Sequence, residues 1–230
     1  MVIVAECGVN WNGKFVLATQ MIFMAKRCGA SLVKFQLFDC QKLARTQEQF
    51  DALKPCQLTN EQAESLFQFG QAVGIEVFFS VFDSLRVEWC EKIGVKRYKL
   101  AATMADYETI EAVRATNKPV IASTVAGDAT MAGDARHLPM SWKFLYCVPE
   151  YPTPLRRIQL PHFVDAMVGF SDHTVGLDAS MIALARGAEI IEKHFVLEHD
   201  AKYPEESFSM SPEELRHLAN WEQMCAAVSK

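Results

Sequence analysis

The sequence has no long apolar run, and this absence excludes several classes of protein. No stretch of the 230 residues approaches the roughly 20 apolar residues that a membrane-spanning helix needs. The segment before Glu6 is short and carries no positively charged side chain, so it does not resemble a signal peptide. We therefore expect a cytoplasmic protein with no membrane partner.

Basic blocks and paired cysteine motifs are also missing. The net charge is −5 and the isoelectric point is near 5.7, which argues against nucleic acid as a partner. The seven cysteines include no Cys-x-x-Cys pair, and their number is odd. This pattern predicts free, mostly buried thiols in a reducing compartment rather than disulfides or a zinc site.

The sequence does contain a regular alternation of strand and helix patterns. The expected strands are residues 2–5, 31–36, 76–82, 97–102, 119–124 and 143–148, followed by two that end in His173 and His194. The expected helices are residues 15–28, 59–73, one ending at 93, 107–116, one within 125–138, 155–166, 177–188 and a last one with Ser211 as N-cap and Pro212 at its first position.

Eight strand–helix units in alternation predict an α/β fold, a (β/α)8 TIM barrel that forms a single domain over residues 1–230. An open doubly wound sheet is the alternative. It more often carries a Gly-x-Gly-x-x-Gly turn after its first strand, and Gly8 to Gly13 does not match that spacing. The polar passage 39–58 is interpreted as an active-site loop, not a domain boundary.

Polar side chains gather at the predicted carboxyl ends of the strands, where a barrel has its active site. Lys34 and Lys99 are the most informative, because a lysine in an apolar strand is costly to bury without an anion. Either lysine alone could instead extend its charge to the barrel rim. Two of them, with the hydroxyls of Ser123 and Ser171, predict a site for a phosphate or carboxylate.

His173 and His194 end two strands that are joined by one predicted crossover helix. Such strands are parallel neighbours, so both imidazoles should lie at the same end of the barrel. Two hydrogen-bonded structural histidines are the alternative interpretation. Beside carboxylates, the pair predicts a divalent metal site of the Mn²⁺, Zn²⁺, Fe²⁺ or Co²⁺ type rather than a Ca²⁺ site.

Seven segments match the sequence motifs of one known family, and they occur in the same order as in that family. They are residues 5–13 (Ala-Glu-Cys-Gly-Val-Asn-Trp-Asn-Gly), 33–36 (Val-Lys-Phe-Gln), 98–100 (Tyr-Lys-Leu), 119–124 (Pro-Val-Ile-Ala-Ser-Thr), 151–154 (Tyr-Pro-Thr-Pro), 169–174 (Gly-Phe-Ser-Asp-His-Thr) and 191–195 (Ile-Glu-Lys-His-Phe). Together they resemble the barrel domain of the sialic acid (nonulosonate) synthase family. That resemblance covers nearly the whole chain.

The resemblance implies a transferase that condenses phosphoenolpyruvate (PEP) with an N-acylated aldose, such as N-acetylmannosamine, and releases phosphate. It implies a divalent metal, typically Mn²⁺, with Mg²⁺ or Co²⁺ as alternatives, held by His173 and His194. By analogy, the metal polarises the aldehyde, C3 of PEP attacks it, and water adds at C2 before phosphate leaves.

The resemblance also implies roles for single residues. Those that fall where the family holds PEP are Lys34, Lys99, Ser123, Tyr151 and Ser171. Glu6 matches a catalytic acid at the end of the first strand, and Glu205 stands where the family has the aspartate of a Gly-Pro-Asp loop. Other expected site residues, in or beside the matching segments, are Asn10, Gln36, Asp172 and Lys193.

Departures from the family pattern concentrate on substrate recognition. Trp11 replaces a histidine, Val81 stands where a PEP-contacting threonine is usual, and Pro149 replaces an asparagine or serine. Leu100-Ala-Ala-Thr-Met104 replaces Ile-Gly-Ser-Gly-Glu, so that Ala102 loses a hydroxyl and Met104 a carboxylate. The small antifreeze-like domain that usually follows the barrel has no counterpart among these residues.

We therefore expect a PEP-dependent condensing enzyme with a changed acceptor. One alternative is a weak or inactive barrel that binds a metal and an anion in a regulatory or assembly role. Another is one chain of a two-polypeptide synthase. The expected ligands are small molecules, and a homodimer or a separate partner chain is left open.

Overall fold

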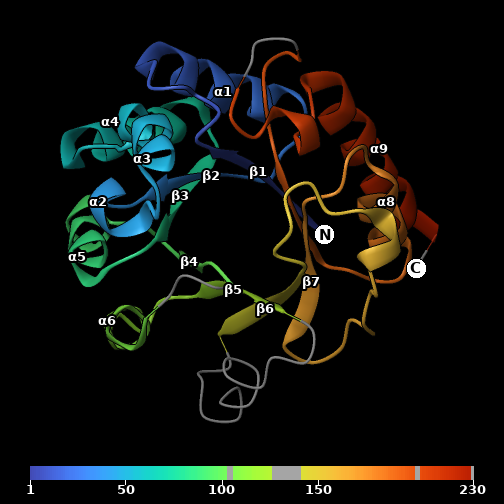
Figure 1. The fold of residues 1–230 in the computed structure, drawn as a ribbon. Coiled ribbons are helices and arrows are strands. Elements are labelled where there is room, and N and C mark those ends of the chain that lie inside the picture. Colours follow the sequence, from blue (N-terminus) through green and yellow to red (C-terminus); the bar gives the residue numbers. More distant parts are fainter. Residues whose placement is uncertain (103–105, 126–140, 200–202, 229–230) are drawn as a thin grey trace.

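A closed barrel of eight parallel strands forms the centre of the computed structural model, and helices surround it (Figure 1). The structure describes residues 1–102, 106–125, 141–199 and 203–228. The strands follow one another around the barrel in chain order. They are β1 (Val2–Gly8), β2 (Leu32–Leu37), β3 (Glu76–Val81), β4 (Tyr98–Leu100), β5 (Val120–Val125), β6 (Trp142–Cys147), β7 (Met167–Asp172) and β8 (Ile190–His194). The predicted TIM barrel is confirmed.

The helices lie outside this ring. They are α1 (Phe15–Arg27), α2 (Cys40–Leu43), α3 (Gln47–Leu53), α4 (Asn60–Val73), α5 (Ser84–Ile93), α6 (Tyr107–Ala115), α8 (Asp178–Ala185) and α9 (Pro212–Val228), with short 3₁₀ turns at Lys54–Cys56, Leu155–Arg157 and Glu206–Phe208. The polar passage 39–58 thus contains two short helices. No helix of the described chain is both long and apolar enough to cross a bilayer.

Local sequence signals explain several helix ends. At the start of α4, the Thr59 hydroxyl accepts from the backbone N–H of Gln62, and the Gln62 side chain accepts from the backbone N–H of Thr59. Gly74 ends α4 in the left-handed conformation, with φ +76°. The Ser211 hydroxyl likewise accepts from the backbone N–H of Glu214 at the start of α9. These predicted boundaries are confirmed.

The barrel interior is built in two layers because strand side chains alternate between its inside and outside. An apolar layer fills its amino-terminal half and consists of Val4, Leu32, Phe78, Ile121, Leu145, Val168 and Ile190. On six of these seven strands, the residue two positions further on forms a second layer: Glu6, Lys34, Ser80, Ser123, Cys147 and Glu192. On β7, a register shift opposite Leu145 gives this position to Ser171. The polar layer therefore lies towards the carboxyl ends of the strands.

The predicted helix at residues 155–166 is wrong. Beyond the 3₁₀ turn Leu155–Arg157, the segment up to β7 has no helix. Pro161 lies inside the predicted span, and a proline within a helix removes a backbone hydrogen bond and clashes with the preceding turn. The helix expected within residues 125–138 falls mostly outside the described residues.

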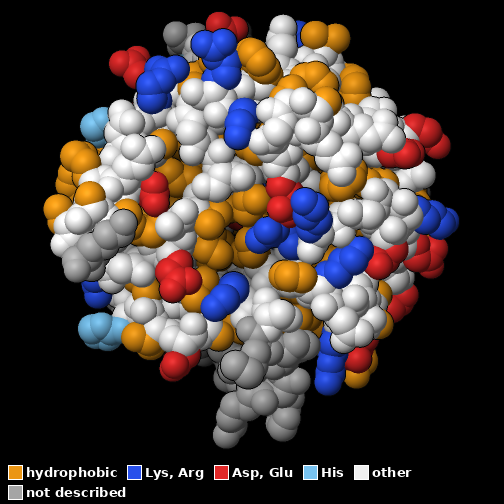
Figure 2. All heavy atoms as spheres, turned by 180° about the vertical axis from the view of Figure 1, so that it is seen from behind, with side chains coloured by type: hydrophobic (Ala, Val, Ile, Leu, Met, Phe, Trp, Pro, Cys, Tyr) orange, Lys and Arg blue, Asp and Glu red, His pale blue; other side chains and the backbone are white. Residues whose placement is uncertain are grey.

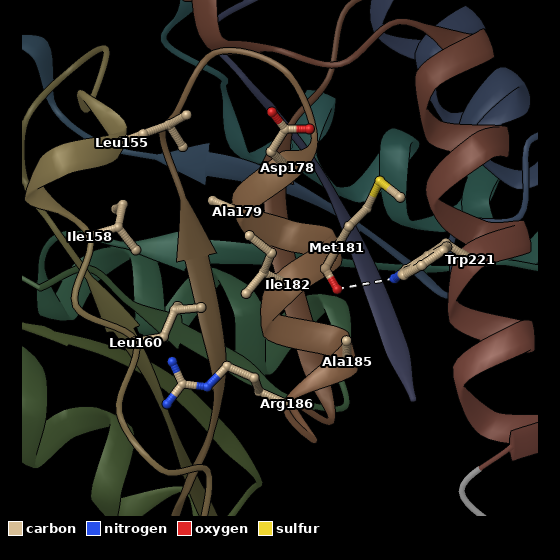
Figure 3. A pocket seen from close by; sticks show the side chains of 10 residues that line it. All are labelled: Leu155, Ile158, Leu160, Asp178, Ala179, Met181, Ile182, Ala185, Arg186 and Trp221. Atoms are coloured by element: carbon tan, nitrogen blue, oxygen red, sulfur yellow. Dashed lines mark hydrogen bonds between the residues drawn. The ribbon is translucent and has the colours of Figure 1, made fainter.

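A groove on the outer surface lies beside α8, where this crossover has no helix. It has a volume of about 610 Å³ and is lined by Leu155, Ile158 and Leu160 on one side and by α8 and Trp221 on the other (Figure 3). The Trp221 indole N–H donates to the backbone carbonyl of Met181 at 3.0 Å, which ties α9 to α8. The groove contains none of the predicted site residues.

The cysteines and the charged surface side chains are arranged as the composition led us to expect. All seven cysteines are buried and none is in a disulfide, as predicted. On the face seen in Figure 2, Lys and Arg side chains are intermixed with Asp and Glu, so that this face has no extended basic surface.

Candidate functional site

Lys34 is the centre of a buried ionic group in the polar layer of the barrel. Its Nζ lies 3.0 Å from Oε2 of Glu6 and 3.5 Å from Oε1 of Glu192, and it donates to the Ser80 hydroxyl at 2.7 Å. All four residues are at most 5% exposed. Gln36 donates to Oε1 of Glu6 at 2.8 Å and so holds the other oxygen of that carboxylate.

Lys99 approaches the same carboxylate from the other side of the barrel. Its Nζ donates to the Ser123 hydroxyl at 2.7 Å and to the Leu100 carbonyl at 2.9 Å, and it lies 3.7 Å from Oε1 of Glu192. Ser171 donates to that same Oε1 at 3.1 Å. Glu192 is thus shared by two lysines and a serine.

The charges of this group shift the pKa of each member. Burial opposes the ionised form of Glu192, but Lys34 and Lys99 more than offset it and lower its pKa to about 2. Burial raises the pKa of Glu6, with Lys34 acting in the opposite direction. The pKa of Lys34 is raised, because Glu192 and Glu6 outweigh the effect of burial. Burial lowers that of Lys99, against the attraction of Glu192.

The four residues predicted from β2, β4, β5 and β7 to hold an anion therefore lie together: Lys34, Lys99, Ser123 and Ser171. In the structure, Glu6 and Glu192 supply the negative charge that the buried lysines require. No role is predicted for Glu192 or Ser80 from the sequence. Both could have been found by extending the inward-facing alternation of β8 and β3 beyond the apolar layer.

His173 and His194 lie side by side at the carboxyl ends of β7 and β8. Their ring centroids are 5.5 Å apart, and each side chain is 6% exposed. Nδ1 of His173 lies 3.3 Å from the Val148 carbonyl oxygen, and Nδ1 of His194 lies 3.0 Å from Oε2 of Glu205. In each ring an oxygen lies close to Nδ1, so Nε2 is the nitrogen that is available to bind an ion.

Two imidazoles at this separation fit one divalent ion, because metal-bound nitrogens lie roughly 2.0–2.1 Å from the ion. Metal-binding histidines usually have an oxygen at their second ring nitrogen, as both do here. Burial, then His194, lowers the pKa of His173 to about 3, so its ring is neutral at pH 7. Among the described residues, no group of three or more His, Cys, Asp or Glu side chains is placed to hold a metal ion, so the two imidazoles are the candidate ligands.

Glu205 reaches this pair from the segment after β8. Its carboxylate accepts from the Val9 backbone N–H at 3.3 Å, and its own N–H donates to the Asn10 side-chain oxygen at 3.1 Å. Burial opposes ionisation of Glu205, but His194 more than offsets this and lowers its pKa. For His194, the carboxylates of Glu205 and Glu6 outweigh burial and raise the pKa. Asn10 thus anchors the segment that carries Glu205.

Comparison with known proteins identifies the family of this chain. The model of the NeuB family matches residues 21–229. This chain belongs to the NeuB family.

Several proteins similar to this NeuB-family chain are named as synthases of legionaminic, pseudaminic or sialic acids. N,N'-diacetyllegionaminic acid synthase of Legionella pneumophila is 29% identical over 94% of this chain and 69% of its own length. An uncharacterized protein of Methanocaldococcus jannaschii is 30% identical over 95% of this chain and 68% of its own length. The crystal structure of N-acetylneuraminic acid synthetase from Leptospira borgpetersenii, in complex with citrate, superposes with a TM-score of 0.91 at 26% identity, covering 99% of this chain and 84% of that one.

Positions where this NeuB-family chain departs from the expected pattern fall in different environments. Trp11 and Val81 are each 1% exposed and belong to the apolar core between barrel and helices. Val81 therefore does not face the polar layer, where Ser80 supplies a hydroxyl to Lys34 instead. Pro149 is exposed and Ala102 is half-buried, whereas Met104 lies outside the described residues.

Tyr151 stands at the mouth of the barrel of this NeuB-family chain. Its ring centroid lies 4.3 Å from that of His173 and 5.7 Å from that of Phe208, and the residue is 55% exposed. The side chain is therefore close to the histidine pair and accessible to a ligand that enters from solvent.

Asp172 and Lys193, two further predicted site residues, form a buried pair on the outer side of the barrel. Their atoms Oδ2 and Nζ lie 3.2 Å apart, and they are 0% and 1% exposed. Asp172 also accepts from the Ser180 hydroxyl of α8 at 2.5 Å, and Lys193 donates to the Thr174 carbonyl at 2.7 Å. Neighbouring residues Ser171 and Glu192 face inward, so alternation directs this pair towards α8. Its contacts fasten β7 and β8 to the helix layer.

The first prediction concerns this pair. Asp172→Ala should destabilise the fold by about 3–5 kcal/mol, because it leaves the Lys193 ammonium buried without its counter-charge. Urea denaturation followed by circular dichroism measures this. Asp178→Ala is the matched control: Asp178 is exposed in the first turn of α8, and its loss should cost at most about 1 kcal/mol. Equal losses in both variants would contradict the assignment.

Proposed function

We propose that this NeuB-family chain catalyses a metal-dependent condensation of PEP with an aldose to give a 2-keto-3-deoxy sugar acid and phosphate. The observation that carries the proposal is the placement of two buried lysines and two adjacent histidines at one end of the barrel. The lysine ammonium groups can donate charge-assisted hydrogen bonds to an anionic substrate, and the imidazoles suit a divalent ion. Legionaminic and sialic acid synthases among the relatives support the reaction class.

Lys99 is the group best prepared to take an incoming anion. A lysine ammonium has three N–H donors. Ser123 and Leu100 take two of them, and the contact to Glu192 is 3.7 Å, longer than a hydrogen bond. In the proposed reaction, Lys99 and Lys34 bind the carboxylate and phosphate of PEP, with the hydroxyls of Ser123 and Ser171 as further donors.

His173 and His194 are the proposed ligands of the divalent ion, with Mn²⁺ as the first candidate and Mg²⁺ or Co²⁺ as alternatives. When bound, the ion supplies Lewis-acid polarisation of the aldehyde carbonyl. Tyr151, beside His173, covers the ligand at the barrel mouth.

The proposed chemistry forms a bond between C3 of PEP and the aldehyde carbon. Water then adds at C2, and the bond between C2 and the phosphate oxygen breaks, which releases phosphate and leaves the 2-keto acid. Glu6 is the group proposed to move the protons, because it lies at the end of β1 beside His194 of β8. Lys34 and Gln36 hold its two oxygens.

The acceptor sugar is proposed to differ from N-acetylmannosamine. Trp11, in the loop where the resembling family has a histidine, is buried in the core and cannot replace that polar side chain. Ala102 likewise has no hydroxyl. Recognition of the acceptor therefore depends on other groups at the mouth, such as Tyr151 and Gln36.

Phosphate release is the test of the proposed function. The purified chain is mixed with PEP, Mn²⁺ and a panel of N-acylated and unsubstituted aldoses, and phosphate is measured with and without EDTA. We expect release that needs both an aldose and the metal. Absence of release with every acceptor, together with intact PEP binding, supports the inactive-barrel alternative. Release that appears only on adding a second polypeptide supports the two-chain alternative.

A further inference from the structure

The Glu205 carboxylate lies against the ring of His194, a contact that a residue acting directly on substrate would not need. Its carboxylate oxygen Oε2 lies 3.0 Å from Nδ1 of His194, a buried ring atom with no aligned hydrogen bond elsewhere in the described chain. The two atoms meet the distance of an ion pair but are not aligned as a hydrogen bond. The carboxylate thus points at the histidine and not into open space.

The surrounding backbone is built to keep it there. The Glu205 N–H donates to Asn10, its carbonyl accepts from the Ser209 hydroxyl at 2.6 Å, and Oε2 accepts from the Val9 N–H. Asn10 in turn donates to Ser209 at 3.0 Å. Both ends of the residue are therefore held by neighbouring polar groups.

Gly8 leaves the space that this carboxylate fills. Its φ of +48° favours glycine, and a Cβ at this position would clash with Oε2 of Glu205. The same Cβ would come within 3.3 Å of Nδ1 of His194. The end of β1 is thus shaped around the contact between Glu205 and His194.

We propose that Glu205 is a positioning residue that acts through His194. By holding Nδ1, it orients the ring and directs Nε2 to an ion shared with His173, whose own Nδ1 lies against the Val148 carbonyl. Carboxylates that hold the second nitrogen of a metal-binding histidine typically contribute 10- to 100-fold to metal affinity. This inference rests on the proposed function only for the metal, and it departs from the role of catalytic carboxylate implied by the family resemblance.

The length of the side chain is part of the inference. An aspartate, which the resembling family has here, is shorter by one methylene group. With the backbone fixed by Asn10 and Ser209, its carboxylate would withdraw from Nδ1 of His194. Glu205→Asp should therefore weaken metal binding, although it restores the residue expected for a substrate-contacting role.

The test measures metal affinity without substrate. Mn²⁺ binding is titrated by electron paramagnetic resonance for the wild type and for Glu205→Ala, Glu205→Asp and Glu205→Gln, and the Co²⁺ absorption spectrum reports the ligand set. We expect about 10- to 100-fold weaker binding for the Ala and Asp variants. The Gln variant should stay within about threefold, because its amide oxygen can take the same place beside Nδ1 that the carboxylate oxygen has. Glu198→Gln, an exposed carboxylate before the same loop, is the matched control and should bind as the wild type does.

Each other outcome overturns the inference in a distinct way. If the Gln variant loses affinity as strongly as the Ala variant and its Co²⁺ spectrum changes, Glu205 is a direct ligand. If all three variants bind Mn²⁺ like the wild type but release less phosphate, Glu205 acts on substrate. A wild type that binds no metal overturns both the inference and the proposed metal site. A wild type that binds metal but releases no phosphate contradicts the proposed function alone.

Discussion

Lys99→Met should abolish anion binding and destabilise the barrel, and the added substitution Glu192→Gln should restore only the stability. Lys99 is 2% exposed and gives Glu192 one of its two positive neighbours. Methionine has a similar length but no charge, so Glu192 keeps only Lys34 and Ser171 as partners. Removing one partner of a buried charge group costs about 3–5 kcal/mol, whereas replacing the whole pair by neutral groups is often neutral. The double variant should therefore unfold at nearly the wild-type urea concentration.

Activity should not return in the double variant, because the proposed role of Lys99 is to bind the substrate anion. Loss of one positioned electrostatic donor typically lowers turnover by about 10²- to 10³-fold. Urea denaturation gives the stability, calorimetric titration with PEP gives the affinity, and phosphate release gives the rate. Recovery of PEP affinity together with stability would show that Lys99 only balances the charge of Glu192. That result would remove the main support for the anion site.

The barrel could be predicted because strand patterns and helix patterns alternate along most of the chain, and the helix caps agree with them. The Thr59 capping box and the Ser211 cap are local signals that tertiary packing did not override. The helix predicted at 155–166 does not form, because it contains Pro161, whose backbone cannot continue a helix. The resulting groove beside α8 could not be foreseen from spacing alone.

The site was predictable to the extent that position along a strand decides orientation. His173 and His194 end adjacent strands, and the structure brings them together. Asp172 and Lys193 are one step out of phase with the inward-facing residues and pair on the outside instead. Their place in the family-like segments at the strand ends had grouped them with the site, although alternation separates them.

Contacts between distant segments could not be read from the sequence. Val9 and Glu205 are 196 positions apart, and their contact depends on how the segment after β8 returns over the end of β1. The inward-facing position of Glu192 could be predicted from the sequence, but its charge state could not, because its pKa depends on two lysines from other strands. Such charge sharing emerges only when the barrel closes.

His173→Ala should abolish metal-dependent turnover. The described chain offers no cluster of three acidic, histidine or cysteine groups that could keep the ion after one imidazole is lost. With His194 as the remaining imidazole, Mn²⁺ affinity should fall below detection by electron paramagnetic resonance. Phosphate release should drop to the level of the wild type treated with EDTA, and adding Mn²⁺ should not raise it.

A matched control separates metal loss from misfolding. His217→Ala removes an exposed histidine of α9 and should leave Mn²⁺ affinity and turnover unchanged. Thermal unfolding of both variants checks that the barrel is intact, since His173 also packs against Tyr151. If His173→Ala folds and still releases phosphate at the wild-type rate, the histidine pair is not a metal site. The carbonyl would then have to be polarised by hydrogen-bond donors of this chain instead of by an ion.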